Sequence, residues 1–549
     1  MSIDRRRFIQ GTIASGFSRM PAGGRAPDSV VFRLVDEKSM RPVSGRVRLV
    51  DAQGSEVVPL GHPEMFRIDA QEGDVSIQSR RFSYSEGELH IDPARLPLRY
   101  EAVKGYEYLI GKGEIRRENL RDGSMTVPLR RWSALAERGW YSGDIHIHHI
   151  APETCRLEMD AEDLNVANIL TSDFTTDQNQ FEGKVNGLSA GRRLIYLSQE
   201  FRHDDLGHLC LLNLKRLVQP VKPIQTLHSP LHLRVYNEAH DQGGYVSWAH
   251  FPSWPGLESP LDVAMEKLDG LEIMCQLDPR EFPIFVKQVV PELEANDGLR
   301  LWYRYLNCGF RLTATAGTDK MTAFVTVGAN RVFARVDGDF TYEAWIDALK
   351  AGRTFVTNSP VLQFTVNGRE PGATVQVDSK RGGVVGISAS ADSQLPYHRL
   401  EIVCNGRVIA QATPTGPYYH AEIVLEQQIR DSCWFAARAL EDIDNYRKSG
   451  LPFTKVHSPE GTLHGNYYGT RRPETVFAHT SPVYVIRDGE PIRNWDDADY
   501  YARYLDRCIQ WLGTDGRFAS ESDRSSTIAA FQDARTVYLG RAADARRGT

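Results

Sequence analysis

Apolar and polar residues alternate in short runs from Val30 to about Arg131. The segments VVFRLVD, GRVRLVDAQG and YEYLIGKGEI show this alternation, and Gly, Asp and Pro residues separate them. A period of two between turn residues is typical of strands that bury one face. The pattern predicts a small β-sandwich over residues 28–132, and no clustered chemistry in it suggests more than an accessory role.

The pattern of apolar and polar residues changes between residues 133 and 360, where short apolar runs alternate with helical patterns. DAEDLNVANILTSDF reads as a helix running into a strand. A second helix has Ser229 as its N-cap and Pro230 at its first position, and it ends near Gly243 before the strand YVSWAH. Alternating strands and helices imply a largely parallel sheet, so this segment predicts a distorted (β/α) barrel.

Strand patterns return in residues 361–456 and predict a second β-sandwich. An extended segment and a helical tail follow in residues 457–549, where apolar residues such as Tyr501, Leu505 and Leu512 recur at helical spacing. Ser520 with Asp523 caps the last helix. Taken together, the patterns predict the α/β fold class: a distorted (β/α) barrel between two β-sandwich domains, with a helical tail.

Composition narrows the range of partners. The chain has 549 residues, 25% of them charged, and a net charge of −6 with no basic block, so nothing indicates binding to nucleic acid. No apolar run approaches the roughly 18 residues of a membrane span. Seven scattered cysteines, never in CxxC spacing, argue against a disulfide framework and a thiolate zinc site. We therefore expect a small-molecule substrate, and the oligomeric state stays open.

The first 27 residues contain three consecutive arginines, Arg5 to Arg7, followed by Phe8 and a short apolar stretch. This arrangement resembles a twin-arginine export signal, which carries folded and often metal-loaded proteins across the bacterial membrane. We expect a periplasmic or exported protein. A disordered basic tail on a cytoplasmic protein is the alternative.

Histidines cluster in the middle of the chain. Nine of the 16 lie between His146 and His250, where an even distribution would place about three. In the strand GDIHIHHI, His146 and His148 are two positions apart and share a face. Other predicted strands carry metal-binding side chains at or near their ends, where the rim of a barrel would gather them. The candidate metal ligands are His146, His148, Glu200, His208, His250 and Asp319. His228, His232 and His240 sit at helix ends, where a structural role is expected.

Five blocks carry a family likeness: GDIHIHH, LSQEFRHDDLGHLCLLNL, YVSWAHFP, YRYLNCGFRLTATAGTDKM and ALKAGRTFVTNSP. In this order, over Gly139 to Pro360, they resemble the carbaryl-hydrolase-like (CehA/McbA) metallohydrolases, relatives of the polymerase-and-histidinol-phosphatase (PHP) barrels. The resemblance implies that His146 and His148 form the HxH pair and that Glu200 is a bridging carboxylate. It assigns Asp319 to the same centre and implies that His208 and His250 complete a second metal position.

The resemblance also limits the number of metal ions. Many PHP barrels hold a third ion through an aspartate shortly after HxH and two further histidines. This chain lacks that aspartate and has Phe174 and Met321 at the histidine positions. We therefore expect one or two divalent ions rather than three. Nitrogen and oxygen ligands without thiolate favour Zn²⁺ or Mn²⁺.

These residues predict a metal-dependent hydrolase that uses a metal-activated hydroxide on an ester, carbamate or amide bond. His203 is a candidate proton shuttle and Lys320 a candidate oxyanion stabiliser, although a solvated turn and simple charge balance are the alternatives. A PHP-type phosphoesterase and a non-catalytic glycan-binding envelope protein are the rival functions.

Overall fold

The structure is a computed structural model, and it describes residues 29–547 apart from 69–72, 78–79, 174, 176–179, 252–255, 276–297 and 442–475. The predicted export signal, residues 1–27, lies outside the described residues, as does Phe174. Strands outweigh helices, at 37% against 23% of the described residues.

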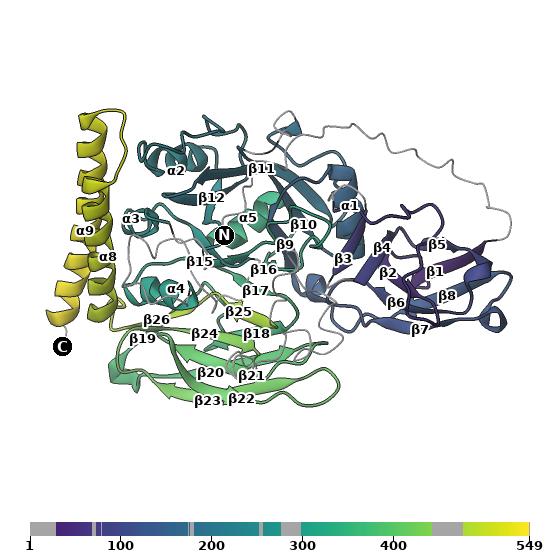
Figure 1. Ribbon diagram of the computed structural model, residues 1–549. Coiled ribbons are helices and arrows are strands. Elements are labelled where there is room, and N and C mark those ends of the chain that lie inside the picture. The colour runs from purple at the N-terminus through teal and green to yellow at the C-terminus, as the bar shows by residue number, and fades with distance from the viewer. Residues whose placement is uncertain are drawn as a thin grey trace.

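The N-terminal strands form two small sheets that pack on a shared apolar core (Figure 1). Phe32, Leu34 and Leu129 are fully buried between them, because alternate residues of each strand face inward. The three-stranded sheet contains β5 (Glu88–Ile91), β1 (Val30–Asp36) and β8 (Ser124–Leu129). The five-stranded sheet contains β3 (Asp74–Ile77), β4 (Arg80–Ser85), β2 (Gly45–Val50), β6 (Leu98–Val103) and β7 (Gly111–Ile115).

A curled sheet of 15 strands forms the centre of the molecule. The order of its first part is β15 (Thr313–Ala316), β14 (Gly270–Met274), β13 (Tyr245–Trp248), β12 (Gly207–Leu212), β11 (Leu194–His203), β10 (Val166–Thr171) and β9 (Trp140–Ile147). It continues through β16 (Arg331–Arg335), β17 (Thr354–Thr357), β25 (Phe477–Thr480), β24 (Cys433–Leu440), β21 (Arg399–Cys404) and β22 (Arg407–Ala412). Two further strands, β26 (Val483–Arg487) and β19 (Thr374–Val377), extend it from β24.

The predicted α/β barrel is wrong. The sheet resembles half of a barrel, and only seven helices accompany it in the described residues. β11, β12 and β13 pair antiparallel, as do β9, β16 and β17, while the other pairs between β9 and β15 are parallel. The connection from β11 to β12 is only residues 204–206, far too short for the crossover that a parallel pair requires.

The described part of the sheet also lacks the continuous ladder that would close it into a barrel, because only a single parallel bridge, Ile147 with Lys320, joins the end of β9 to the segment after β15. β15 lies against β17, but the contact is a side-chain hydrogen bond from Thr354 Oγ1 to the Ala314 carbonyl, 2.9 Å, and no backbone ladder joins the two strands in the described residues. Instead, β17 pairs with β25 and continues into the C-terminal strands. The central sheet thus crosses the boundary that the sequence pattern predicts at residue 360.

A three-stranded sheet packs against the far part of the central sheet. It contains β18 (Val361–Val366), β20 (Val384–Asp392) and β23 (Ala421–Gln428). Buried residues such as Phe364, Ile387 and Phe435 fill the space between the two layers. The central sheet contributes β25 and β26 to this two-layer region. Both strands follow residue 456, where the sequence pattern places the end of the second β-sandwich.

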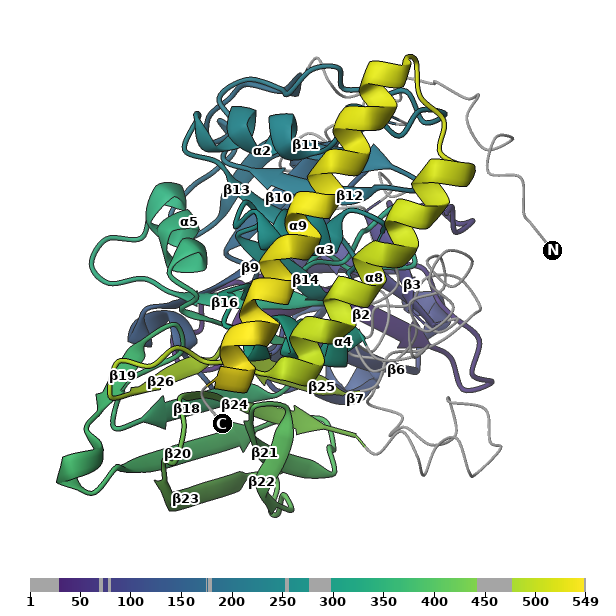
Figure 2. The ribbon, with the colours of Figure 1, turned by 90° about the vertical axis from the view of Figure 1, so that its left-hand side faces the viewer.

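The helices cover the outside of the central sheet. The shorter ones are α1 (Pro152–Ala161), α2 (Leu233–His240), α3 (Ser259–Ala264), α4 (Gly298–Asn307) and α5 (Tyr342–Lys350). At the C-terminus α8 (Trp495–Thr514) and α9 (Glu521–Arg547) form an antiparallel hairpin that lies across α3 and α4 (Figure 2). Tyrosine hydroxyls anchor it: Tyr501 donates to Leu301 O and Tyr538 to Pro260 O. Among the described helices, none is both long and apolar enough to cross a membrane.

Candidate metal centre

Two histidines project from the end of β9 into the curl of the sheet. His146 and His148 are both fully buried, and their Nε2 atoms lie 3.0 Å apart. The close approach of helix α5 on one side of β9 and of the segment after β15 on the other explains a glycine at each place. A Cβ on Gly143 would meet the Trp345 ring at 2.2 Å, and one on Gly317 would meet His146 Cβ at 2.6 Å. The local sequence therefore lets β9 sit tightly against its neighbours while it presents both imidazoles on one face.

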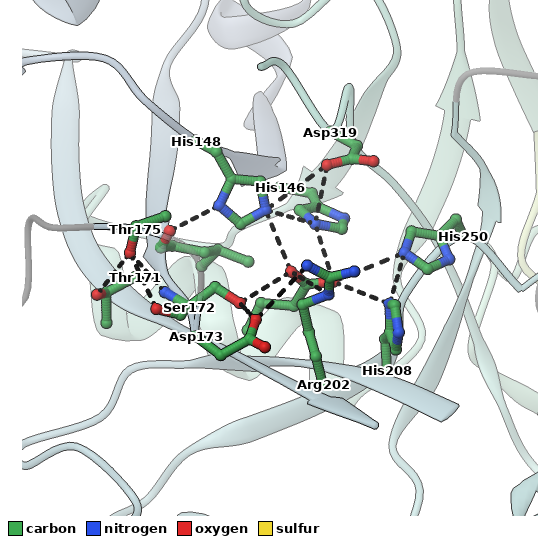
Figure 3. A network of polar contacts seen from close by, with 12 residues as sticks. His146, His148, Thr171, Ser172, Asp173, Thr175, Arg202, His208, His250 and Asp319 are labelled. Atoms are coloured by element: carbon green, nitrogen blue, oxygen red, sulfur yellow. Dashed lines mark hydrogen bonds and ion pairs between the residues drawn. The ribbon is translucent and has the colours of Figure 1, made fainter. Parts of the chain in front are cut away.

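Two carboxylates face the same pair of nitrogens (Figure 3). Glu200, in β11, places its Oε2 3.3 Å from His148 Nε2 and its Oε1 3.6 Å from His146 Nε2. Asp319, after β15, places its Oδ1 3.5 and 3.6 Å from the same two nitrogens. Side chains from four residues thus bring potential ligand atoms together at this place.

A second pair of histidines, His208 and His250 at the right of Figure 3, also lies against Glu200. His208 Nδ1, in β12, lies 3.3 Å from Glu200 Oε1, and His250 Nε2, after β13, lies 3.6 Å from the same oxygen. The two ring nitrogens are 3.1 Å apart. Glu200 is therefore shared by two groups, and all six residues predicted as ligands come together around it.

Hydrogen bonds behind the first pair of rings fix which nitrogen faces the centre. His148 Nδ1 donates to the Leu170 carbonyl at 2.7 Å, and His146 Nδ1 lies 3.1 Å from Glu272 Oε2. A neutral ring that donates through Nδ1 carries a lone pair on Nε2. Two such nitrogens at 3.0 Å need either a proton or a metal ion between them, and a metal ion can be bound by both lone pairs at once. The donor set therefore fits a divalent metal ion.

Arg202 sets the charge of the shared carboxylate. Burial raises the pKa of Glu200, but the Arg202 guanidinium and hydrogen bonds from the surrounding histidines outweigh it and hold this pKa well below its ordinary value. Arg202 Nε lies 3.7 Å from Glu200 Oε2, and its Nη1 lies 3.5 Å from Asp173 Oδ1. Our sequence reasoning missed Arg202, although its position two residues after Glu200 on one strand places both on the same face.

Two further carboxylates hold the ligands in place and were also missed. Glu272 Oε2, in β14, accepts from the His250 backbone N at 2.5 Å as well as from the His146 ring. Asp144 accepts from Thr318 N and Oγ1, at 3.0 and 2.7 Å, and so ties β9 to the segment that carries Asp319. The available signal was a buried carboxylate inside an otherwise apolar strand, as in LEIM and DIHI.

A strained backbone conformation helps to orient two of the candidate metal ligands, His250 and Asp319. His250 has φ of 34° and Asp319 φ of 44°, both in the left-handed region that residues other than glycine rarely adopt. Such conformations cost on the order of 1–3 kcal/mol each and persist where the surrounding structure holds them. In both cases the turn follows a short strand; His250 then faces Glu200, and Asp319 faces His146 and His148.

The structure does not bring His203 or Lys320 to this cluster. His203 Nε2 donates to the Leu227 carbonyl at 2.7 Å, and its Nδ1 accepts from the backbone N of Leu206 at 3.1 Å. Burial lowers the pKa of His203 to about 4, so the ring is neutral and holds the turn after β11. Lys320 is fully buried with its Nζ 3.3 Å from Glu158 Oε1, on the side away from Asp319. The expected proton shuttle and oxyanion stabiliser thus make structural contacts instead.

Comparison of the sequence with protein-family models and with curated proteins found no match. The chemistry of the site is therefore inferred from its own geometry.

Proposed function

We propose that this chain is a metal-dependent hydrolase whose centre holds one or two divalent ions, Zn²⁺ or Mn²⁺. One observation carries this function: two pairs of imidazole nitrogens, 3.0 and 3.1 Å apart, both lie against a single buried carboxylate, Glu200, whose Oε1 is 3.6 Å from His146 Nε2 and 3.3 Å from His208 Nδ1. A carboxylate shared in this way is suited to two ions roughly 3.5–4 Å apart, an arrangement that hydrolytic enzymes use. Because the sheet is not a (β/α) barrel, this function rests on the site and not on the fold.

A bound divalent ion would lower the pKa of a water molecule toward 7 and polarise the bond to be cleaved. The protein's own residues prepare this chemistry. Glu200 stays ionised at neutral pH because of its lowered pKa, and the hydrogen bonds to Leu170 and Glu272 keep the ligand nitrogens of His148 and His146 turned inward.

Arg202 is the group in this chain best suited to act on a substrate. Its side chain is 16% exposed, and it reaches the edge of the centre between Glu200 and Asp173. A planar guanidinium at that place can donate hydrogen bonds to a carbonyl or phosphoryl oxygen as charge develops on it. We assign to Arg202 the role that the sequence suggested for Lys320.

The substrate class follows from the resemblance to the carbaryl-hydrolase-like enzymes, which favours an ester, carbamate or amide bond. A phosphoesterase is the second candidate, because a cationic side chain beside a two-ion site also suits a phosphoryl group. If the centre is not catalytic, the β-rich regions remain candidates for glycan binding.

A substrate panel tests this function. Nitrophenyl acetate, an aryl carbamate and bis-nitrophenyl phosphate are incubated with the Mn²⁺- or Zn²⁺-loaded protein, with and without chelator. We expect turnover of the acetate or the carbamate that the chelator abolishes and that His148→Ala lacks. Turnover of the phosphate diester alone would select the phosphoesterase. No metal-dependent turnover of any of the three would contradict a hydrolase.

A further inference from the structure

A second group of metal-binding side chains lies outside the centre around Glu200. It contains His232 at the start of α2 and Glu258 and Asp262 at α3, and each is fully buried. The Phe201 and Trp248 rings separate it from the curl of the sheet, with centroids 5.9 and 6.0 Å from the His232 ring. Phe201 follows Glu200 on β11 and therefore points to the opposite face of that strand. The group lies behind the sheet, under the C-terminal hairpin.

Neighbouring groups hold the two carboxylates in position. The His232 backbone N donates to Glu258 Oε1 at 2.6 Å, and the Tyr236 hydroxyl donates to Asp262 Oδ2 at 2.9 Å. Glu258 and Asp262 are four residues apart on one helical turn, so they lie on the same side of it. Their position relative to the His232 ring is therefore set by the fold.

Polar atoms in this group converge without satisfying one another. His232 Nδ1 lies 3.4 Å from Glu258 Oε2 and 3.5 Å from an oxygen of Asp262. Within the described part of the chain, neither ring nitrogen makes a hydrogen bond, and neither do Glu258 Oε2 and Asp262 Oδ1. Buried polar atoms almost always have a partner, so four such atoms in one place call for an explanation.

The charges of the two carboxylates also need an explanation. Two carboxylates are buried together, and no lysine or arginine among the described residues forms an ion pair with either. Either a shared proton or a cation must neutralise the pair.

The distances favour a cation. Ligand atoms about 2.1 Å from a tetrahedral zinc ion are about 3.4 Å from one another, which matches the two separations from His232 Nδ1. A proton shared between the two carboxylates would leave His232 Nδ1 unsatisfied, whereas a cation would bind it. We propose that His232, Glu258 and Asp262 bind a second, structural divalent cation, with Zn²⁺ as the best fit, which ties α2 to α3 behind the sheet.

Metal content separates this site from the centre around Glu200. The wild type, His148→Ala and Asp262→Asn are loaded with Zn²⁺, passed over a chelating column and measured by inductively coupled plasma mass spectrometry. Asn keeps an oxygen to accept from Tyr236, so Asp262→Asn is a mild change. We expect Asp262→Asn to contain one equivalent less than the wild type. In His148→Ala the cation behind the sheet stays, and only unfolding in guanidinium releases it.

Thermal stability gives a second readout with opposite signs for the two explanations. If a cation is bound, Asp262→Asn lowers the melting temperature. Added Zn²⁺ then raises the melting temperature of His148→Ala, and this rise is absent when His148→Ala and Asp262→Asn are combined. If the carboxylates share a proton, the chain must take up that proton when it folds at neutral pH; Asp262→Asn removes this cost and raises the melting temperature. Equal zinc content in wild type and Asp262→Asn, or a wild type that holds no equivalent released only by unfolding, would overturn the proposal. Because none of these readouts measures hydrolysis, they are independent of the proposed function.

Discussion

Glu272 provides a quantitative test of how the metal centre is held together. Its Oε2 accepts from the His146 ring at 3.1 Å and from the His250 backbone N at 2.5 Å, so one buried carboxylate orients a ligand of each group. Glu272→Gln keeps the shape of the side chain and removes its charge. Loss of such a partner typically weakens metal binding about 10- to 100-fold, or about 1.4–2.7 kcal/mol.

Asp269→Asn is the matched control. Asp269 also accepts from an imidazole, His240 Nε2 at 2.9 Å, and from a backbone N, that of Val246 at 2.7 Å, but it lies at the other end of β13. We expect Mn²⁺ affinity, measured by competition with a fluorescent chelator, to fall only in Glu272→Gln. Equal affinity in Glu272→Gln and wild type would refute the orienting role of this carboxylate, and an equal fall in Asp269→Asn would show that the effect is not local.

Three further outcomes follow from the contacts. Arg202→Gln should lower kcat/KM for the cleaved substrate about 10²- to 10³-fold at saturating Mn²⁺; full activity under these conditions would exclude Arg202 from catalysis. Lys320→Met leaves the buried Glu158 without its cation and should lower the free energy of unfolding in urea by about 3–5 kcal/mol, with wild-type metal content; lost metal with unchanged stability would contradict this. Burial lowers the pKa of His479 to about 3. The unfolded chain takes up a proton below about pH 6.5 and the folded one does not, so stability falls as the pH drops through this range. Between pH 7.5 and 5 the wild type should lose about 2 kcal/mol more than His479→Gln, and equal losses would contradict a neutral buried ring.

The ligand positions could be predicted from the sequence because they depend on local rules. His146 and His148 share a face by strand periodicity, and Glu200, His208 and Asp319 lie in or directly after short apolar strands. These rules hold whether neighbouring strands run parallel or antiparallel. For this reason the cluster could be located although the predicted fold was wrong.

The fold could not be predicted because it depends on connections and pairings between distant segments. The sequence pattern does not show that residues 204–206 form a tight turn between antiparallel strands, or that β17 pairs with β25 more than a hundred residues later. The role given to Lys320 failed for a local reason. The positive φ of Asp319 turns the chain, so adjacent side chains point to different surroundings.

X-ray diffraction from crystals of the Mn²⁺-loaded protein, recorded at the manganese absorption edge, tests the central claim most directly. We expect anomalous density within coordination distance of Glu200, between its oxygens and the facing nitrogens of His146 and His148, and a second peak beside His208 and His250 if two ions bind. Well-diffracting crystals with no anomalous density next to Glu200 would contradict a metal centre at this place.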